Sequence, residues 1–247
     1  MLSSRYQLMD LNFRQFKFLT FDCYGTLINW ESGILGALRP ILKNHNKNLD
    51  EAQLLNLYAE LESAIERGEF KPYREVLKQV VRGCGDRLGF KATDQEANSL
   101  PESLKNWRPF PDTVASLKSL ARNYRLCVIS NIDDDLFLHT ARHLEVSFHV
   151  VVTALQARSY KPSHNNFRLA LEKIGAPKEQ VLHVAESLFH DIAPARELGI
   201  KNVWVDRSKG RRGRASRVAD VKPDLEVLDL KTLAELVERD LGSPKRC

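Results

Sequence analysis

The chain has 247 residues, of which 43% are hydrophobic and 28% charged, and its formal net charge is +5. This composition is ordinary for a globular protein with enough apolar sequence to build a core, and it excludes fibrous and disordered classes. No apolar run approaches the ~20 residues that span a bilayer, and the N-terminal stretch lacks a secretory signal. We therefore expect a cytoplasmic protein with no membrane partner.

The positive charge is partly local, in RSKGRRGRASR (207–217) and in the terminal PKRC. A basic segment rich in Gly and Ser is typical of a solvated loop, and charge alone supports nucleic-acid binding weakly. We expect no nucleic-acid partner, and a small anionic substrate instead.

The cysteines show no CxxC spacing, which predicts reduced thiols, with Cys23 and Cys127 packed in the core. They are Cys23, Cys84, Cys127 and Cys247.

Short apolar segments followed by loops predict buried strands along the chain. They are FKFLTF (16–21), RLCVISN (125–131), FHVVVT (148–153), VLHVA (181–185), NVWVD (202–206) and DLEVLD (224–229). None alternates cleanly between apolar and polar residues, as expected for parallel strands covered on both faces. Helical patterns lie between or after them, at 112–123, 136–144, 164–175, 191–200 and 231–242. This alternation predicts an α/β fold with a doubly wound parallel sheet.

The stretch from residue 30 to 108 differs from the rest of the chain. It shows helical periodicity, as in EAQLLNLYAELESAIERG (51–68) and REVLKQVVRGCGDRLG (74–89), and no convincing strand. We predict an all-helical cap domain of residues 30–108, inserted into an α/β core domain of residues 1–29 and 109–247.

Polar side chains gather where the predicted strands end. Asp22 follows the first strand, Ser130 and Asn131 end the second, and Lys161 lies in the loop after the third. Asp191 opens the helix after the fourth. Because ligands of open α/β sheets bind beyond the carboxyl ends of the strands, these residues are candidates for a single site.

These residues belong to segments that resemble a known family. The segments FDCYGTL (21–27), ISN (129–131), YKP (160–162) and HVAESLFHDIAPARELGI (183–200) resemble, in order, the four motifs of the haloacid dehalogenase superfamily. The helical insert also falls where that family places a cap. The resemblance covers nearly the whole chain and implies a Rossmann-like core.

The resemblance also implies roles for individual residues. Asp22 matches the nucleophilic aspartate, Lys161 the lysine that balances its charge, and Asp191 the acid of the fourth motif. A nearby ammonium offsets the repulsion between an anionic nucleophile and an anionic substrate. We therefore predict that Asp22, Lys161 and Asp191 are catalytic.

Four further residues are predicted to bind or border the substrate. Thr26 matches the threonine that steadies the nucleophile, and Ser130 and Asn131 match positions that hold the anionic group of the substrate. Tyr24 stands two residues after Asp22, where phosphatases of the superfamily usually carry a second aspartate that protonates the leaving alcohol. A halide leaves without a proton, and the L-2-haloacid dehalogenases have the same DxYGTL form.

The resemblance therefore implies a hydrolase of 2-haloalkanoic acids that works through an aspartyl ester and gives 2-hydroxyacids. No metal or other cofactor is expected for that reaction. The resemblance also carries an expectation of a homodimer. An aliphatic and aromatic cap, with Trp30 near the hinge, would keep water from the site.

Some positions depart from the dehalogenase pattern. Glu186, Ser187 and Leu188 stand where that branch has Ser-Ser-Asn, and Glu186 falls where phosphatases have a magnesium ligand. Asp22, Glu186 and Asp191 are thus candidate Mg²⁺ ligands of an alternative, a phosphatase of small phosphorylated metabolites. A second alternative is a non-catalytic member that binds an anion.

The arginine that receives halide is also missing, because Ala59 lies at or beside its place. Arg39, Arg67 and Arg74 are candidates to take its place, although an arginine on a helix is more often a solvated charge.

The remaining polar residues near the motifs have structural interpretations. His183 sits in an apolar strand and is interpreted as a hydrogen-bonded core residue, whereas His190 is placed to reach the cleft. Asp133, Asp134 and Asp135 are interpreted as the first turn of a helix, where acids offset the helix dipole.

Overall fold

The computed structural model describes residues 11–207 and 220–242. Its centre is a six-stranded parallel sheet with the order β3-β2-β1-β4-β5-β6. The strands are β1 (Phe18–Phe21), β2 (Arg125–Ser130), β3 (Val150–Thr153), β4 (Val181–Ala185), β5 (Lys201–Val205) and β6 (Leu225–Val227). All six strands were predicted from the sequence. The order reverses between β1 and β4, and such a switch point forms a crevice at the carboxyl ends of the strands.

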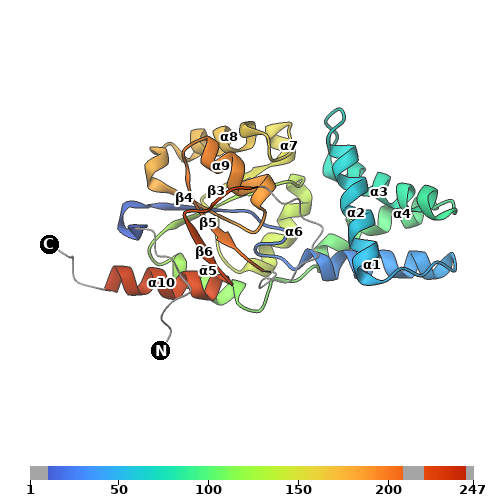
Figure 1. Cartoon of the computed structure of the whole chain (residues 1–247), viewed down its shortest axis with the longest axis horizontal. Helices are drawn as coiled ribbons and strands as arrows, with labels where there is room; N and C mark the ends of the chain where they lie inside the picture. Colours follow the sequence, from blue (N-terminus) through green and yellow to red (C-terminus); the bar gives the residue numbers. More distant parts are fainter. Residues whose placement is uncertain (1–10, 208–219, 243–247) are drawn as a thin grey trace.

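Both faces of the sheet are buried, which explains why the strand sequences do not alternate with polar residues. Along β2, Leu126 and Val128 belong to one hydrophobic cluster. Cys127 and Ile129, which point the other way, belong to a second cluster. Helices cover both faces, with α7, α8 and α9 on one side and α5 and α10 on the other (Figure 1). The chain therefore has the expected doubly wound α/β architecture.

The helices around the sheet agree with most of the predicted ones. They are α5 (Thr113–Leu120), α6 (Asp134–Leu144), α7 (Ala154–Ala157), α8 (His164–Ile174), α9 (Ala193–Glu197) and α10 (Leu230–Gly242). The helix predicted at 191–200 is present over most of its length: a π-helical turn, η4 (Leu188–Ile192), runs directly into the short α9, and the helix ends at Glu197. Pro194 stands in the first turn of α9, where a missing N–H is tolerated. Short 3₁₀ turns are η1 (Phe13–Gln15), η2 (Leu104–Asn106) and η3 (Lys178–Gln180).

A helical insertion lies beside the sheet, as expected (Figure 1). Its helices are α1 (Trp30–Asn44), α2 (Glu51–Glu66), α3 (Tyr73–Leu88) and α4 (Asp94–Ser103). Capping explains where two of them begin: Asp50 and Gln53 form a capping box at α2, and Thr93 and Glu96 form one at α4. We call α1–α4 the cap; the predicted domain limits at residues 29/30 and 108/109 stay a prediction.

The chain enters and leaves the cap along two neighbouring segments. Asn29 N–H donates to Arg108 O at 2.9 Å, and Phe110 N–H donates to Leu27 O at 3.0 Å. The cap is also bound to the sheet side by Asp133, whose carboxylate accepts the N–H groups of Tyr73 (2.8 Å) and Arg74 (2.9 Å). These contacts hold the α2–α3 end of the cap over the strand ends.

The acids after β2 lie at the start of α6, as predicted, with Asp133 at the N-cap position and Asp134 and Asp135 in the first turn. The side chain of Asp133 caps α3 rather than its own helix. None of the described helices is long and apolar enough to cross a membrane.

Cys23, Cys84 and Cys127 are buried free thiols, so the predicted core positions of Cys23 and Cys127 are confirmed. Cys247 and, apart from Arg207, the basic segment 207–217 lie outside the described residues.

Candidate active site

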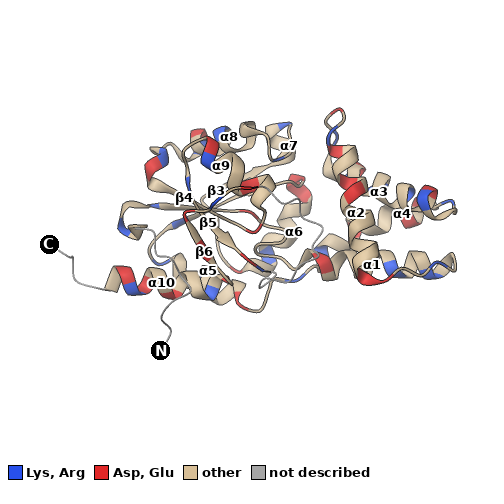
Figure 2. Cartoon of the chain, viewed as in Figure 1, with Lys and Arg blue, Asp and Glu red and all other residues tan. Residues whose placement is uncertain are grey.

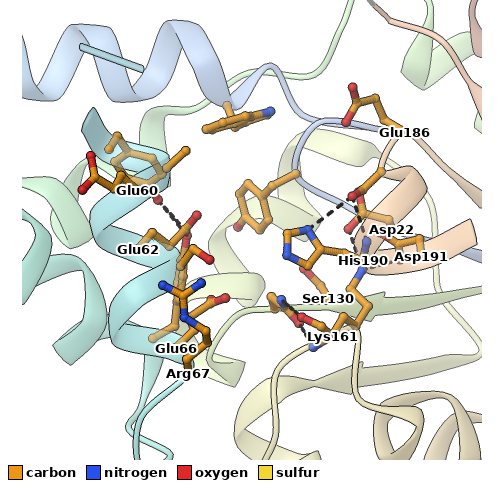
Figure 3. Close-up of a pocket in the computed structure, with 18 of the residues that line it drawn as sticks. Asp22, Glu60, Glu62, Glu66, Arg67, Ser130, Lys161, Glu186, His190 and Asp191 are labelled. Atoms are coloured by element: carbon orange, nitrogen blue, oxygen red, sulfur yellow. Dashed lines mark hydrogen bonds and ion pairs between the residues drawn. The ribbon is translucent and has the colours of Figure 1, made fainter. Parts of the chain in front are cut away.

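A cavity of about 310 Å³ lies at the carboxyl ends of β1, β2 and β4, between the sheet and the cap. On the sheet side its lining includes Asp22, Ser130, Asn131, Lys161 and Asp191. The structure thus brings together residues that the sequence placed at the ends of different strands. Figure 3 shows Asp22, Ser130, Lys161 and Asp191 opposite acidic residues of α2.

Asp22 is held by contacts to both of its carboxylate oxygens. Oδ2 accepts a hydrogen bond from Thr26 Oγ1 at 2.6 Å, and Oδ1 accepts one from Lys161 Nζ at 2.8 Å. The loop after β1 turns sharply at Gly25, whose φ of +100° is a conformation that favours glycine. The turn brings Thr26 back to Asp22.

The ammonium of Lys161 is buried and fully coordinated by oxygen. It donates to Asp22 Oδ1 (2.8 Å), Asp191 Oδ1 (2.7 Å) and Ile129 O (2.9 Å). Burial alone would lower its pKa, but the charges of Asp191 and Asp22 outweigh burial and raise the pKa of Lys161 above its ordinary value. Lys161 therefore stays charged and balances the two carboxylates.

Asp191 is bound from two sides. Besides Lys161, His183 Nε2 lies 3.1 Å from Asp191 Oδ1, and His183 Nδ1 lies 2.9 Å from Thr20 Oγ1. Burial would raise the pKa of Asp191, but the Lys161 charge and the His183 hydrogen bond lower it to about 2. The predicted core position of His183 is confirmed, and its contact with Asp191 is a role that the sequence did not indicate.

Asp22 differs from Asp191 in its electrostatics. Burial raises the pKa of Asp22 above its ordinary value of 3.8, against the lowering effect of Lys161, and the neighbouring Asp191 charge adds to the rise. Asp22 therefore accepts a proton more readily than Asp191. A nucleophile that is more basic than its neighbour suits attack on carbon.

The predicted substrate-binding residues divide into two kinds. Ser130 lines the cavity, and its buried Oγ has no hydrogen-bond partner among the described residues. Asn131 also lines it, but its amide exchanges hydrogen bonds with the backbone of Lys161, at 2.7 and 3.2 Å. Thr26 is fully buried and does not line the cavity; it donates to Asp22 and accepts from the N–H of Glu186 at 2.9 Å. Thr26 thus acts on Asp22 rather than on a ligand.

Tyr24 lines the cavity, and its hydroxyl group points toward α6. Its hydroxyl lies 2.7 Å from Thr140 Oγ1, and its ring packs edge-on against Trp107. Burial raises the pKa of Tyr24 well above its ordinary value. The position that follows Asp22 by two residues therefore carries a neutral, anchored phenol.

The cap wall of the cavity contains residues that were not predicted. Aromatic side chains line it, as expected for Trp30, but so do Glu62 and Glu66. Glu62 Oε1 accepts hydrogen bonds from Tyr58 (2.7 Å) and Tyr73 (2.5 Å). The signal in the sequence was the spacing of residues 58, 62 and 66, which places them on one face of α2. Such a polar stripe usually faces solvent, so the sequence alone did not assign it to the site.

The three candidate arginines occupy different environments. Arg67 lines the cavity, as does Ala59. Arg39 pairs with Glu51 at 3.4 Å, and Arg74 pairs with Asp135 at 2.5 Å; neither lines the cavity. Arg67 is thus the candidate of the three that the structure places at the site.

The three acids of the alternative magnesium site, Asp22, Glu186 and Asp191, line the same cavity but do not cluster around one point. Glu186 lines the cavity, but no three His, Cys, Asp or Glu side chains of the described residues are arranged to hold one ion. The ammonium of Lys161 lies between Asp22 and Asp191 and contacts both. His190, as predicted, reaches the cavity, where its Nδ1 lies 3.2 Å from Ser187 Oγ.

Comparison with known families supports the assignment made from the motifs. A family described as haloacid dehalogenase-like hydrolase matches residues 16–199. The chain belongs to this family. This hydrolase is 23% identical to an (S)-2-haloacid dehalogenase of Pseudomonas fluorescens over 226 residues, which is 90% of this chain and 96% of that protein.

Relatives with other names are also found. A phosphatase of Escherichia coli, 5-amino-6-(5-phospho-D-ribitylamino)uracil phosphatase YigB, is 27% identical over 235 residues, 89% of this chain and 95% of that protein. The haloacid dehalogenase-like hydrolase domain-containing protein 3 of Danio rerio is 33% identical over 124 residues, so the match spans only 51% of that protein. Sequence similarity thus establishes a hydrolase family and leaves the reaction open.

Solved structures share the fold. The L-2-haloacid dehalogenase of Xanthobacter autotrophicus with chloropropionic acid covalently bound has a TM-score of 0.74 and 19% identity, over 90% of this chain and 98% of that one. L-2-haloacid dehalogenase PA0810 has a TM-score of 0.76 and 21% identity, over 90% of this chain and 99% of that one.

Proposed function

We propose that this hydrolase cleaves the carbon–halogen bond of 2-haloalkanoic acids through an ester on Asp22. The observation that carries the proposal is Tyr24, whose hydroxyl is bound to Thr140 at 2.7 Å and whose pKa burial raises. An alcohol leaving group needs an acid near the nucleophile, whereas a halide leaves as a stable anion. The site therefore suits a leaving group that needs no proton.

In the first step, a carboxylate oxygen of Asp22 attacks C2 of the substrate from the side opposite the halogen. The new C–O bond forms as the C–X bond breaks, and the halide departs with the bonding electron pair. Thr26 and Lys161 fix the carboxylate at 2.6 and 2.8 Å, which reduces the orientational freedom lost in reaching the transition state. The unpartnered Ser130 hydroxyl is available to donate to the substrate carboxylate, and Arg67 is the candidate to receive halide.

In the second step, water attacks the carbonyl carbon of the ester. The product 2-hydroxyacid leaves with one proton of the water on its hydroxyl oxygen, and the other proton passes to solvent. A carboxyl group with a pKa of about 2 is a weak base, so we assign Asp191 to orienting Lys161 and the water rather than to removing the proton. The water oxygen remains in the regenerated carboxylate of Asp22.

The competing hypothesis, a Mg²⁺-dependent phosphatase, is favoured by Glu186 on the cavity wall. It is opposed by Tyr24, which supplies no carboxylic acid at the position where a phosphatase would protonate the leaving alcohol. The similarity to a covalently trapped dehalogenase supports the ester mechanism, and the similarity to YigB supports the phosphatase.

One panel of assays separates these hypotheses. Halide release from both enantiomers of 2-chloropropionate and hydrolysis of p-nitrophenyl phosphate are measured with EDTA and with Mg²⁺, for the wild type and Asp22→Asn. Halide release in EDTA that the substitution abolishes supports the proposal. Phosphate release only with Mg²⁺ contradicts it, and neither activity with retained anion binding points to the non-catalytic alternative.

A further inference from the structure

The cap wall opposite Asp22 carries two carboxyl groups that have no cationic partner within ion-pair distance among the described residues. Glu62 and Glu66 lie one turn apart on α2 and line the same cavity as Asp22 and Lys161 (Figure 3). Figure 2 shows the acidic residues of this helix. Glu60, by contrast, pairs with Arg87 at 2.5 Å, so its charge is balanced. Glu62 and Glu66 are therefore carboxyl groups of this wall that form no ion pair, although Arg67 lines the same cavity.

The residues that contact Glu62 and Glu66 supply no positive charge. Glu62 receives hydrogen bonds from Tyr58 and Tyr73, which are neutral donors. Glu66 makes no hydrogen bond or ion pair to any described residue. Burial raises the pKa of Glu66 well above its ordinary value, the charge of Glu62 adds to the rise, and the charge of Lys161 across the cavity opposes it. Both side chains are partly buried. Partly buried acids without an ion pair lower the stability of a fold, and they are found often where a ligand uses them.

The opposite side of the cavity has the complementary character. Ser130 is only 1% exposed, yet its Oγ has no partner among the described residues, and the charged Lys161 lies on the same side. The Ser130 hydroxyl is free to donate to an acid or another acceptor of the ligand, and the positive charge of Lys161 favours an anion there. The cavity thus offers a ligand a hydroxyl donor at the sheet side and, beside Arg67, two carboxyl groups at the cap side. A plain haloalkanoate would leave these two carboxyl groups without a partner.

We infer that the substrate carries a protonated amine at the end remote from its acid group, and that Glu66, with Glu62, binds this ammonium. The inference rests on the proposed function for the identity of the reacting group. A plain 2-haloalkanoate would leave the two acids without a counter-charge, whereas the ammonium of an ω-amino-2-haloalkanoate would offset their charge. The two carboxylates would then act as specificity determinants on the cap.

The inference is tested by binding, which requires no chemical step. Calorimetry compares 6-amino-2-hydroxyhexanoate with 2-hydroxyhexanoate, the products of the corresponding haloacids, on the wild-type chain at neutral pH. We expect the amino compound to bind about 10- to 100-fold more tightly, as a charged hydrogen bond contributes. Equal affinity, or tighter binding of the compound without the amine, would overturn the inference.

Variants assign the effect to the cap acids. In Glu66→Gln the preference for the amino compound should fall to about twofold or less, with Glu62→Gln reducing it in part. The matched control is Glu51→Gln on the same helix, an exposed residue paired with Arg39 that does not line the cavity. Thermal melts show whether each variant is folded; unchanged preference in folded Glu66→Gln contradicts the inference.

A kinetic arm keeps this inference distinct from the proposed function. Halide release is measured with 2-chloro-6-aminohexanoate and with 2-chlorohexanoate. Release from both at equal kcat/KM supports the chemistry and refutes the selectivity. Absence of halide release together with selective binding of the amine refutes the chemistry and supports the cap acids as an ammonium site.

Discussion

Lys161 Nζ lies 2.8 Å from Asp22 Oδ1, although the two residues are 139 positions apart in the sequence. The contact exists because Asp22 follows β1 and Lys161 follows β3, two strands of one parallel sheet that end at the same edge. The proposed mechanism needs this contact, because the Lys161 ammonium offsets the negative charge of Asp22 only when both side chains face the same cavity. The same ammonium contacts Asp191, so one cation offsets the negative charges of two carboxylates.

Replacement of Lys161 should therefore impair both activity and stability. In Lys161→Gln, two buried carboxylates lose their cation, which typically destabilises a fold by about 3–5 kcal/mol. The pKa of Asp22, already raised by burial, should rise further because the opposing ammonium is gone. Activity requires ionised Asp22, so the acid limb of the kcat/KM profile should move to higher pH.

Urea unfolding and a pH–rate profile measure these effects. Lys118→Gln is the matched control, because Lys118 forms an exposed pair with Glu145 that should contribute at most about 1 kcal/mol. A Lys161→Gln protein with wild-type stability and an unmoved acid limb would contradict the assigned role.

Covalent catalysis by Asp22 makes an isotopic prediction. In a single turnover in isotopically labelled water, the water oxygen should enter the carboxylate of Asp22 and not the first molecule of product. The reason is that water attacks the ester carbonyl rather than C2 of the substrate. Mass spectrometry of the peptide containing Asp22 detects the label. Label found in the product and absent from Asp22 would indicate direct attack of water on the substrate.

Tyr24 provides a test of the leaving group. Tyr24→Phe removes the hydroxyl and its 2.7 Å contact with Thr140, which should lower stability by about 1 kcal/mol. Halide release should remain within about threefold of wild type, because no proton is delivered to the halide. Stopped assays of halide and urea unfolding measure the two effects. A loss on the order of 10²-fold or more would mean that the phenol acts in the chemistry.

The fold and the polar side chains of the sheet edge could be predicted because they are local properties of the sequence. Strand ends such as Asp22 and Ser130 follow from short apolar runs, and parallel topology brings such ends together. The π-helical form of the first turn, Leu188–Ile192, could not be predicted, because the apolar pattern of the sequence does not distinguish a π-helical turn from an α-helical one.

The cap wall could not be predicted for a different reason. Residues 58, 62 and 66 form a polar stripe on α2, and such a stripe usually faces water. Which face of an inserted helix turns to the sheet depends on tertiary contacts such as those of Asp133 with the start of α3. The contact of His183 with Asp191 was missed similarly, because a histidine in an apolar strand does not show its partner.

His183 should contribute to stability through Asp191. The His183 hydrogen bond helps to hold the pKa of Asp191 at about 2, below its ordinary value of 3.8. A lowered carboxyl pKa contributes stability above the unfolded pKa, and this contribution is lost as pH falls through the folded pKa. His183→Leu should therefore be less stable than wild type near pH 6, by about 1–3 kcal/mol.

The deficit of His183→Leu should narrow as the pH falls from 3.8 toward 2, where Asp191 becomes protonated in both proteins. Urea unfolding at several pH values measures it. Thr20→Val, which removes only the outer 2.9 Å contact of His183, should show a smaller loss. A deficit that stays constant over this range would mean that His183 acts through packing alone.

The contribution of Glu66 to stability should depend on pH in the opposite way to that of Asp191, because the pKa of Glu66 is raised in the folded chain. A raised carboxyl pKa means that stability falls as pH rises above the ordinary value of 4.5, since the folded state resists ionisation. Glu66→Gln removes this penalty and should raise Tm at pH 8 by ~2–4 °C, as a gain of about 1 kcal/mol does in a chain of this size. The gain should shrink toward pH 4.5, where the carboxyl is increasingly neutral in both states. Calorimetric melts at both pH values, with Glu51→Gln as the exposed control, measure the difference. A variant that is less stable than wild type at pH 8 would show that Glu66 has a stabilising partner in the fold, and the acid would then have no need of a cationic ligand.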